Sequence, residues 1–266
     1  MYIYVQQKHV ESYVICKYEY LVYNQMNKEI HFLTPRLADF EDVYLEVREK
    51  EGWICSDAKV RKLPNVSISD VHNDIWKIRR ATANKFVSYL AKKKPKEILE
   101  VGCGNGWFSN FLVHHTHANV LGIDINEMEL NQANRVFVHK RLKFAYADVF
   151  SLEREPTADI IVLNGSVQYF ADPKALMKTL RKFIKPGGEI HILDSPVYAT
   201  DEKAAKAKER TVNYFNKLGF PRMAKFYNHH TLNDFPELTV VATNKKTIIE
   251  KLFRKKISPF PWLKLC

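Results

Sequence analysis

One stretch, residues 98–109, constrains the fold of this chain more than any other. A short apolar run that carries Glu100 leads into three glycines at alternate positions, Gly102, Gly104 and Gly106, and an apolar segment beginning at Trp107 follows. This order is typical of a strand, a glycine turn and a helix. Glycine allows positive φ and lets a ligand approach the backbone without a Cβ in the way. The unpaired N–H groups at the start of the following helix face a ligand that lies in the glycine turn. The stretch therefore predicts a ligand-binding turn.

Polar residues end the next three apolar runs of the chain. The runs at 120–123, 142–147 and 159–163 lead into Asp124, Asp148 and Asn164. In open α/β sheets, ligands bind at the edge where the carboxyl ends of parallel strands meet. We therefore expect these three side chains at one edge. Asp124 follows the glycine turn by about twenty residues, where an acid holds ribose hydroxyls.

The motifs in this order resemble those of class I S-adenosylmethionine-dependent methyltransferases, in the broad type 11 group. The glycine turn departs from the dinucleotide fingerprint G-x-G-x-x-G, because the bulky Trp107 and Phe108 follow Gly106. The resemblance covers roughly residues 75–200. Its matching segments are residues 100–106, 122–125, 147–149 and 180–188.

The resemblance implies an α/β, Rossmann-like class I methyltransferase fold. Its sheet is mostly parallel and seven-stranded in the order 3-2-1-4-5-7-6, has helices on both faces, and ends in a strand antiparallel to the fifth. Strands are predicted at 97–101, 120–123, 142–147, 159–163, 189–193, 238–243 and 260–265. Helices are predicted at 70–91, 107–114, 127–138, 173–184, 201–218 and 245–253, and a candidate lid or substrate loop at 223–230.

The chain divides into a predicted N-terminal β-rich extension or cap, residues 1–65, and a methyltransferase domain, residues 66–266. Aromatic residues that alternate within 1–34 are typical of two or three antiparallel strands. Residues 39–45 favour a short helix. Some relatives carry a cysteine-ligated zinc module ahead of the methyltransferase domain, but Cys16 is the one cysteine of residues 1–34. We therefore expect no zinc and no other metal site.

The resemblance further implies S-adenosylmethionine as the cofactor and S-adenosylhomocysteine as its product. Asp124 is then expected to accept both ribose hydroxyls, and Asp148 the adenine amino group, with the Val149 N–H facing a ring nitrogen. Asn164, or its carbonyl, is expected to meet the methionine ammonium, while Glu100 positions the turn or the amino group through water. The expected cofactor-binding residues are Glu100, Gly102, Cys103, Gly104, Gly106, Asp124, Ile125, Asp148, Val149 and Asn164. The alternative for each is a capping or turn residue.

Two residues of the predicted helix 70–91 have two interpretations each. In relatives the equivalent helix closes over the cofactor, so Trp76 and Arg79 are candidates to touch it. The alternative is that Trp76 packs in the core and that Arg79 forms a salt bridge.

Methyl transfer from a sulfonium is an in-line displacement from an activated donor, so the protein mainly aligns the two reactants. Asp194, Tyr169 and His230 are the candidate catalytic residues, and Tyr198 and His229 are further candidates for a general base. Each has an alternative structural role. Residues 164–169 lack the prolines that follow the equivalent strand in enzymes methylating adenine or glutamine amino groups. This absence argues against that chemistry.

The favoured hypothesis is that the methyl acceptor is a small molecule, and three alternatives stay open. The net charge of +11 suits an RNA or protein methyltransferase, although no RNP, KH or zinc-knuckle pattern supports nucleic acid. A second alternative is a non-catalytic cofactor-binding partner subunit. The third is a membrane-surface enzyme, because residues 248–265 mix lysines with large apolar residues. A helix followed by the final strand explains the same segment.

Cysteine usage and apolar runs bear on the expected compartment. No run of eighteen apolar residues exists, and the first ten residues lack a signal-peptide pattern. The four cysteines form no C-x-x-C pair. We expect free thiols and a cytoplasmic location.

Overall fold

The computed structural model describes residues 30–37, 41–152, 158–242 and 258–265. The antiparallel strands predicted within residues 1–34 fall almost entirely outside these ranges, as does the helix predicted at 245–253.

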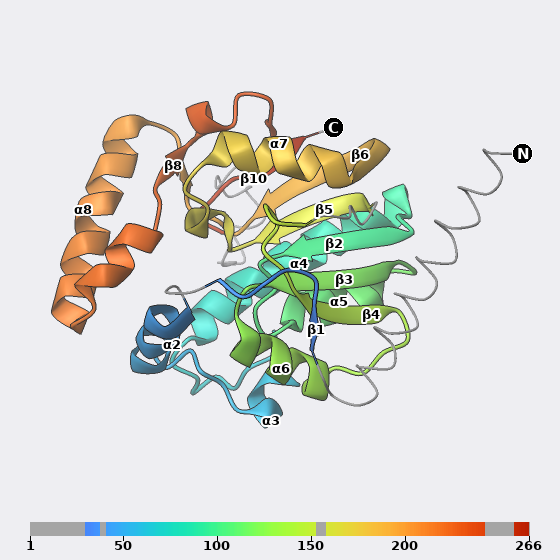
Figure 1. The fold of residues 1–266 in the computed structure, drawn as a ribbon, viewed down its shortest axis with the longest axis horizontal. Coiled ribbons are helices and arrows are strands. Elements are labelled where there is room, and N and C mark those ends of the chain that lie inside the picture. The colour runs from blue at the N-terminus through green and yellow to red at the C-terminus, as the bar shows by residue number, and fades with distance from the viewer. Residues whose placement is uncertain (1–29, 38–40, 153–157, 243–257, 266) are drawn as a thin grey trace, which may run out of the picture.

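A single large sheet forms the centre of the fold (Figure 1). Its strands are β1 (His31–Phe32), β2 (Glu97–Val101), β3 (Asn119–Asp124), β4 (Leu142–Tyr146), β5 (Ala158–Asn164), β6 (Ile184–Leu193), β9 (Thr239–Ala242) and β10 (Trp262–Leu265). Their order is β1-β4-β3-β2-β5-β6-β10-β9. β10 runs antiparallel to β6, and the strands from β1 to β6 pair in parallel. The predicted order is confirmed, with one strand more than the seven predicted.

The additional strand, β1, lies at the edge of the sheet. His31 pairs with Ala145 and Phe32 with Tyr146, both in parallel. The antiparallel partners predicted for these two residues lie outside the described ranges, and the pairing that the structure shows is parallel. Alternation reports which side chains share a face of a strand, but it does not report the direction of the neighbouring strand.

Successive residues of the central strands point to opposite faces, and both faces are apolar. Ile98 of β2 packs in one core cluster, while its neighbour Leu99 packs in the other. Ile160 and Ile161 of β5 divide in the same way. Near-continuous apolar strands are expected where helices cover a parallel sheet on both sides.

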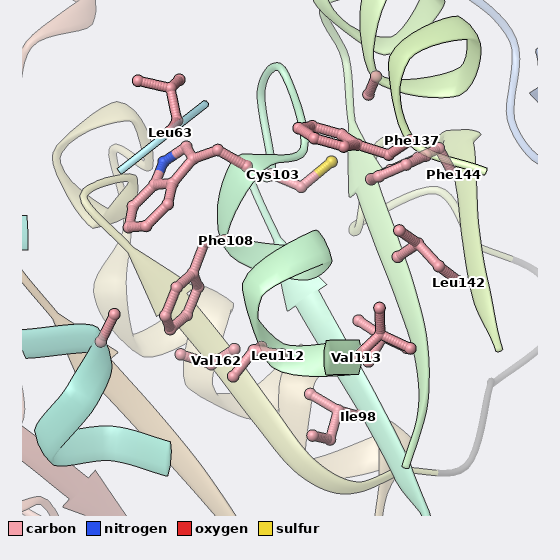
Figure 2. Close-up of a cluster of buried hydrophobic side chains, with 14 of the residues drawn as sticks. Leu63, Ile98, Cys103, Phe108, Leu112, Val113, Phe137, Leu142, Phe144 and Val162 are labelled. Carbon is pink, nitrogen blue, oxygen red and sulfur yellow. The ribbon is translucent and has the colours of Figure 1, made fainter. Parts of the chain in front are cut away.

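Three helices cover the first face: α4 (Asn73–Lys93), α5 (Trp107–His115) and α6 (Glu127–Val136). Phe86 of α4 and Phe108 of α5 are both fully buried, with ring centroids 6.0 Å apart. Figure 2 shows Phe108 and Leu112 of α5 close to Val162 of β5. This cluster fixes α5, and therefore the glycine turn before it.

One helix, α7 (Pro173–Phe183), covers the second face. The Asp172 side chain accepts the Ala175 N–H at 2.9 Å, so the predicted start of this helix is confirmed. β6 follows α7 directly, so residues 185–188, which lie between the predicted helix 173–184 and the predicted strand 189–193, belong to the strand. Lys185 is held there by an ion pair with Asp159, its Nζ lying 3.0 Å from Oδ1.

A smaller layer lies beside the sheet, at the left of Figure 1. It consists of α2 (Glu41–Lys50), α8 (Asp201–Leu218) and the 3₁₀ helix η2 (Pro221–Phe226). The last residues of η2 are the first residues of the predicted lid, 223–230. Val43, Val47, Phe215 and Met223 form its buried cluster. The remaining elements are α3 (Asp57–Val60), η1 (Val167–Tyr169), β7 (Val197–Tyr198), β8 (His230–Thr231) and η3 (Leu232–Asp234).

The position of β10 bears on the membrane-surface alternative. β10 lies between β6 and β9, and its Leu263 is fully buried. Residues 262–265 are therefore sheet residues and are not free to enter a membrane surface. None of the helices in the described ranges combines the length and apolar character that crossing a membrane requires.

Candidate active site

Three cavities open beside the carboxyl ends of the parallel strands. We call them the turn cavity, about 270 Å³; the bridging cavity, about 100 Å³; and the outer cavity, about 520 Å³. Gly165 and Tyr169 line all three. The cavities are therefore contiguous at the loop that follows β5.

The glycine turn forms the wall between the turn cavity and the bridging cavity. Gly102 has a φ of +77°, and a Cβ there would lie 2.5 Å from the Cβ of Ser166. A Cβ on Gly104 would lie 3.2 Å from Oε2 of Glu129. Both glycines line both cavities. The backbone is therefore bare where a ligand would lie against it.

Asp124, at the end of β3, is tied to the turn by its carboxylate. Oδ2 accepts the Gly104 N–H at 2.7 Å, while Oδ1 accepts the N–H groups of Ile125 and Asn126 at 2.8 and 2.9 Å. Burial raises the pKa of Asp124, although these three bonds act to lower it. A carboxylate has about four lone-pair sites, so Oδ2 retains one for a ligand in the turn cavity.

A second carboxylate beside the glycine turn, that of the half-buried Glu129 of α6, was missed by sequence reasoning. It lines the bridging cavity next to Gly104. Burial and the charge of Asp124 raise the pKa of Glu129 to about 7, against the lowering influence of Arg48 and Arg79. The one available signal was helical spacing, because Glu129 stands four residues before the buried Ala133.

Glu100 of β2 is buried, and the Ser109 hydroxyl donates to its Oε2 at 2.5 Å. Burial, with a smaller contribution from the charge of Asp124, raises the pKa of Glu100 to about 8. Its partner lies on α5, so Glu100 joins the strand before the turn to the helix after it. Glu100 also lines the bridging cavity.

Asp148, expected to bind adenine, lines the turn cavity together with Val149 and Ile125. Its carboxylate also stabilises its own turn, because Oδ1 accepts the Phe150 N–H at 3.1 Å and Oδ2 the Ser151 hydroxyl at 2.5 Å. Asp148 therefore occupies the expected place while also acting as a turn residue.

The remaining expected cofactor residues divide into two groups. Cys103 and Asn164 line the bridging cavity. Gly106 is not among the lining residues of the three cavities, and a Cβ there would meet the Phe144 ring at 2.5 Å. Close packing of the turn against β4 therefore accounts for this third glycine.

Of the two residues singled out on α4, Trp76 is a core residue, with 2% of its surface exposed. Arg79 lines the bridging and outer cavities, and its guanidinium lies 4.9 Å from the Trp76 ring centroid and 5.1 Å from that of Trp53. Burial lowers the pKa of Arg79. Within the described ranges its guanidinium makes no salt bridge, so the alternative of an ion pair finds no partner there.

The outer cavity lies between the sheet edge, α2, α4 and α8. Tyr169 and Asp194, two of the candidate catalytic residues, line it. The Tyr169 hydroxyl accepts a hydrogen bond from Arg48 of α2, whose guanidinium also pairs with Glu51 at 2.8 Å. Arg48, a residue that sequence reasoning missed, thus fastens α2 to the loop after β5.

His230, the third candidate, lies elsewhere. Its Nε2 is 2.9 Å from the Phe170 carbonyl, its ring contacts Phe235, and it is buried. It is not among the lining residues of the three cavities. Its contacts are those of a packing residue.

Comparison with known proteins agrees with this geometry. A family model described as a methyltransferase domain matches residues 75–235, more than half of the chain. The chain belongs to this family, and the cofactor of the family is S-adenosylmethionine.

Similar curated proteins span different substrates. Phosphoethanolamine N-methyltransferase 1 of Triticum aestivum is 29% identical over 155 residues, which are 56% of this chain and 31% of the relative. Malonyl-[acyl-carrier protein] O-methyltransferase of Halalkalibacterium halodurans is 28% identical over 130 residues, 44% of this chain and 48% of the relative. The chain therefore spans less than half the length of either relative.

A solved structure shares the fold across most of the chain. Magnesium protoporphyrin IX methyltransferase from Synechocystis PCC 6803, solved with bound S-adenosylhomocysteine, aligns with a TM-score of 0.54 at 14% identity. The alignment covers 85% of this chain and 98% of that one.

Proposed function

We propose that this chain is an S-adenosylmethionine-dependent methyltransferase that acts on a small-molecule acceptor. The observation that carries the proposal is the meeting of the three cavities at Gly165 and Tyr169. A cofactor against the glycine turn and an acceptor in the outer cavity then face each other across this loop. Family membership supports the cofactor, and the cavity supports the acceptor.

The residues of the turn cavity suit an adenosine group. Glycines without side chains accept a flat ligand close to the backbone. We assign the two ribose hydroxyls to the free site on Asp124 Oδ2 and to the carboxylate of Glu129, which lies against Gly104 from the adjoining bridging cavity. Asp148 and Val149 are assigned to the adenine edge.

The residues of the bridging cavity suit an amino acid group. Arg79 supplies a guanidinium that lacks a carboxylate partner among the described residues, and we assign it to the methionine carboxylate. Asn164 and the Gly165 backbone are assigned to the methionine ammonium. When bound, S-adenosylmethionine supplies an activated methyl group.

The role of this chain in the reaction is alignment. The bond from Arg48 to Tyr169 holds α2 against the loop after β5, which narrows the passage between the donor and the acceptor. Holding two reactants in line accounts for much of the rate acceleration of such a displacement. Asp194, at the end of β6, is assigned to the acceptor side.

A small acceptor is favoured by the size and walls of the outer cavity. Its volume of about 520 Å³ lies within the range of small-molecule sites. Tyr198, Tyr214 and Tyr227 line it with amphipathic surface, and α8 covers it. The names of the relatives include a small phosphorylated amine and a malonyl thioester, which supports the same size class.

Calorimetric titration with S-adenosylmethionine and S-adenosylhomocysteine tests the proposal. We expect micromolar binding to the wild type, and its loss in Asp124→Ala. Asp201→Ala, which removes an exposed carboxylate of α8, is the matched control and should bind normally. Absence of binding to a folded wild type would overturn the proposal. Binding without methyl transfer to any acceptor would favour the non-catalytic partner subunit.

A further inference from the structure

Two buried oxygen atoms of residues that line the outer cavity lack hydrogen-bond partners among the described residues. They are Oε1 of Gln168 and Oδ2 of Asp194. Both residues line the outer cavity together with Gly165. Buried polar atoms in proteins nearly always have partners, so an unpaired pair beside one cavity calls for an explanation. One explanation is a ligand that donates a hydrogen bond to each of the two oxygens.

The Gln168 amide is held so that its oxygen remains an acceptor. Its Nε2 donates to the Gly165 carbonyl at 2.6 Å. Because only the NH₂ end of the amide donates, this bond fixes which atom is Oε1. The Gln168 carbonyl also accepts the Asn228 N–H at 2.7 Å, so the backbone of this residue is anchored too. The unpaired oxygen therefore belongs to an immobilised side chain.

The Asp194 carboxylate is held from one side and unpaired on the other. The Thr82 hydroxyl of α4 donates to its Oδ1 at 2.8 Å, while Oδ2 has no partner within hydrogen-bond distance among the described residues. Although burial raises the pKa of Asp194, the Ser258 hydroxyl lies close enough to help lower it. The backbone of Asp194 has a φ of +45°, which is unusual for a residue with a side chain. Unfavourable backbone geometry of this kind persists where the surrounding structure imposes it, and it is frequent at functional sites.

Gly165 contacts both residues at the junction of the cavities. Its carbonyl accepts from Gln168, and the position of a Cβ on Gly165 lies 3.7 Å from the Asp194 carbonyl oxygen. Gly165 also lines the turn cavity and the bridging cavity. Both residues therefore line the outer cavity beside the loop where it meets the two cavities of the cofactor.

We propose that the acceptor atom is an amine nitrogen, whose hydrogens are taken by Gln168 Oε1 and Asp194 Oδ2. This inference rests on the proposed function and names its substrate class. A primary amine offers two N–H hydrogens, and three in its ammonium form, whereas a hydroxyl donates one and a carboxylate or a carbon acceptor none. The Asp194 carboxylate favours a cationic group beside it. Arg48, Arg79 and Arg210 in the walls of the same cavity favour an anionic group elsewhere in the ligand.

The reaction balances with the groups present. The acceptor ammonium first gives one proton to the Asp194 carboxylate. The nitrogen lone pair then forms the N–C bond to the methyl group as the C–S bond breaks, and the electrons of that bond remain on sulfur as a thioether. The methylated amine leaves as a cation, and Asp194 returns its proton to solvent. Gln168 keeps its hydrogen bond and orients the lone pair.

Sinefungin, which carries an amine-bearing carbon in place of the sulfonium and its methyl group, tests the site without knowledge of the acceptor. We expect it to bind the wild type about tenfold more tightly than S-adenosylhomocysteine, because its amine meets both oxygens. In Asp194→Asn and Gln168→Met this preference should disappear, while the Kd for S-adenosylhomocysteine stays unchanged. Asp201→Asn, the same change on the exposed face of α8, should keep the preference.

Equal affinity for the two ligands in the wild type, or an unchanged preference in both variants, would overturn the amine assignment while leaving the proposed function intact. Failure of the wild type to bind either ligand would instead overturn the proposed function. Transfer of a deuterated methyl group to phosphoethanolamine, and not to 2-hydroxyethyl phosphate, would support the assignment. Transfer to the hydroxyl compound alone would contradict it.

Discussion

Gly102 and Ser166 touch across the carboxyl ends of β2 and β5, and the contact leaves no room for a side chain on the glycine. A Cβ on Gly102 would lie 2.5 Å from the Ser166 Cβ and 2.8 Å from its Oγ. Ser166 has little freedom to move away, because its hydroxyl donates to the Val101 carbonyl at 2.8 Å and the residue is buried. The glycine turn is thus fixed by steric packing as well as by its backbone conformation.

Gly102→Ala should therefore destabilise the protein and abolish binding of S-adenosylhomocysteine. Positive φ costs an alanine about 1–2 kcal/mol, and the collision with Ser166 adds about 1–3 kcal/mol. Gly187→Ala is the matched control, because Gly187 has a φ of +76° and nothing within 4 Å of its Cβ position. Denaturant unfolding should show a larger loss in the free energy of unfolding for Gly102→Ala than for Gly187→Ala. Equal losses for the two variants would mean that the collision relaxes.

Affinity for S-adenosylhomocysteine should rise between pH 6 and pH 8, because of Glu129. The pKa of Glu129 is raised to about 7, so its carboxylate is largely protonated at pH 6 and ionised at pH 8. An ionised carboxylate is the better acceptor for a ribose hydroxyl. The Kd should fall by up to about tenfold across this range, since one proton is released. Calorimetry at several pH values measures the effect.

The matched variant for that experiment is Glu129→Gln, which keeps the shape of the side chain and removes its titration. Glu100, whose pKa is raised to about 8, also borders the site and stays in place in both proteins. The difference between the two pH profiles therefore reports Glu129 alone. Identical profiles would remove Glu129 from the ribose site.

Arg79→Met should weaken the binding of both S-adenosylmethionine and S-adenosylhomocysteine by about tenfold to a hundredfold. A hydrogen bond to a charged group contributes about 1.5–3 kcal/mol, and Arg79 is assigned to the methionine carboxylate. Decarboxylated S-adenosylmethionine lacks that carboxylate, so it should bind the wild type and the variant equally. A loss of affinity for all three compounds would instead indicate a structural role for Arg79 between Trp53 and Trp76.

Much of the fold was predictable because its signals are local. The glycine turn and the polar strand ends stand in single short segments, and the sheet order followed from the family resemblance. Gly106 shows the limit of such patterns, since it continues the spacing of Gly102 and Gly104 but packs against Phe144. One residue type meets two different requirements, and spacing does not distinguish between them.

The acceptor side was less predictable because it depends on distant contacts. Arg48 and Tyr169 are separated by 121 positions in the chain, and no periodicity of α2 indicates what its arginine meets. Glu129 stands on a helix that was predicted, but the backbone beside its carboxylate belongs to the glycine turn. Tertiary packing, not local sequence, decides both.

His191 should make the stability of the protein depend on pH between about 6.5 and 4. It is fully buried in β6, and burial lowers its pKa to about 4. Trp262 Nε1 donates to its Nδ1 at 3.0 Å, and an indole N–H only donates, so the ring is neutral with its hydrogen on Nε2 facing Glu189.

In the unfolded chain this imidazole takes up a proton near pH 6.5, whereas the folded protein resists protonation until about pH 4. The unfolded state therefore binds more protons in this window, and the free energy of unfolding falls as the pH falls through it, by up to a few kcal/mol.

His191→Phe should lose this slope but also lose stability at pH 7, because the Trp262 N–H is left unpaired. His117→Phe, at an exposed position after α5, is the matched control and should keep the slope. Denaturant unfolding at pH 4.5, 5.5 and 7 measures all three proteins, and parallel curves for wild type and His191→Phe would show that His191 is not the buried titrating group.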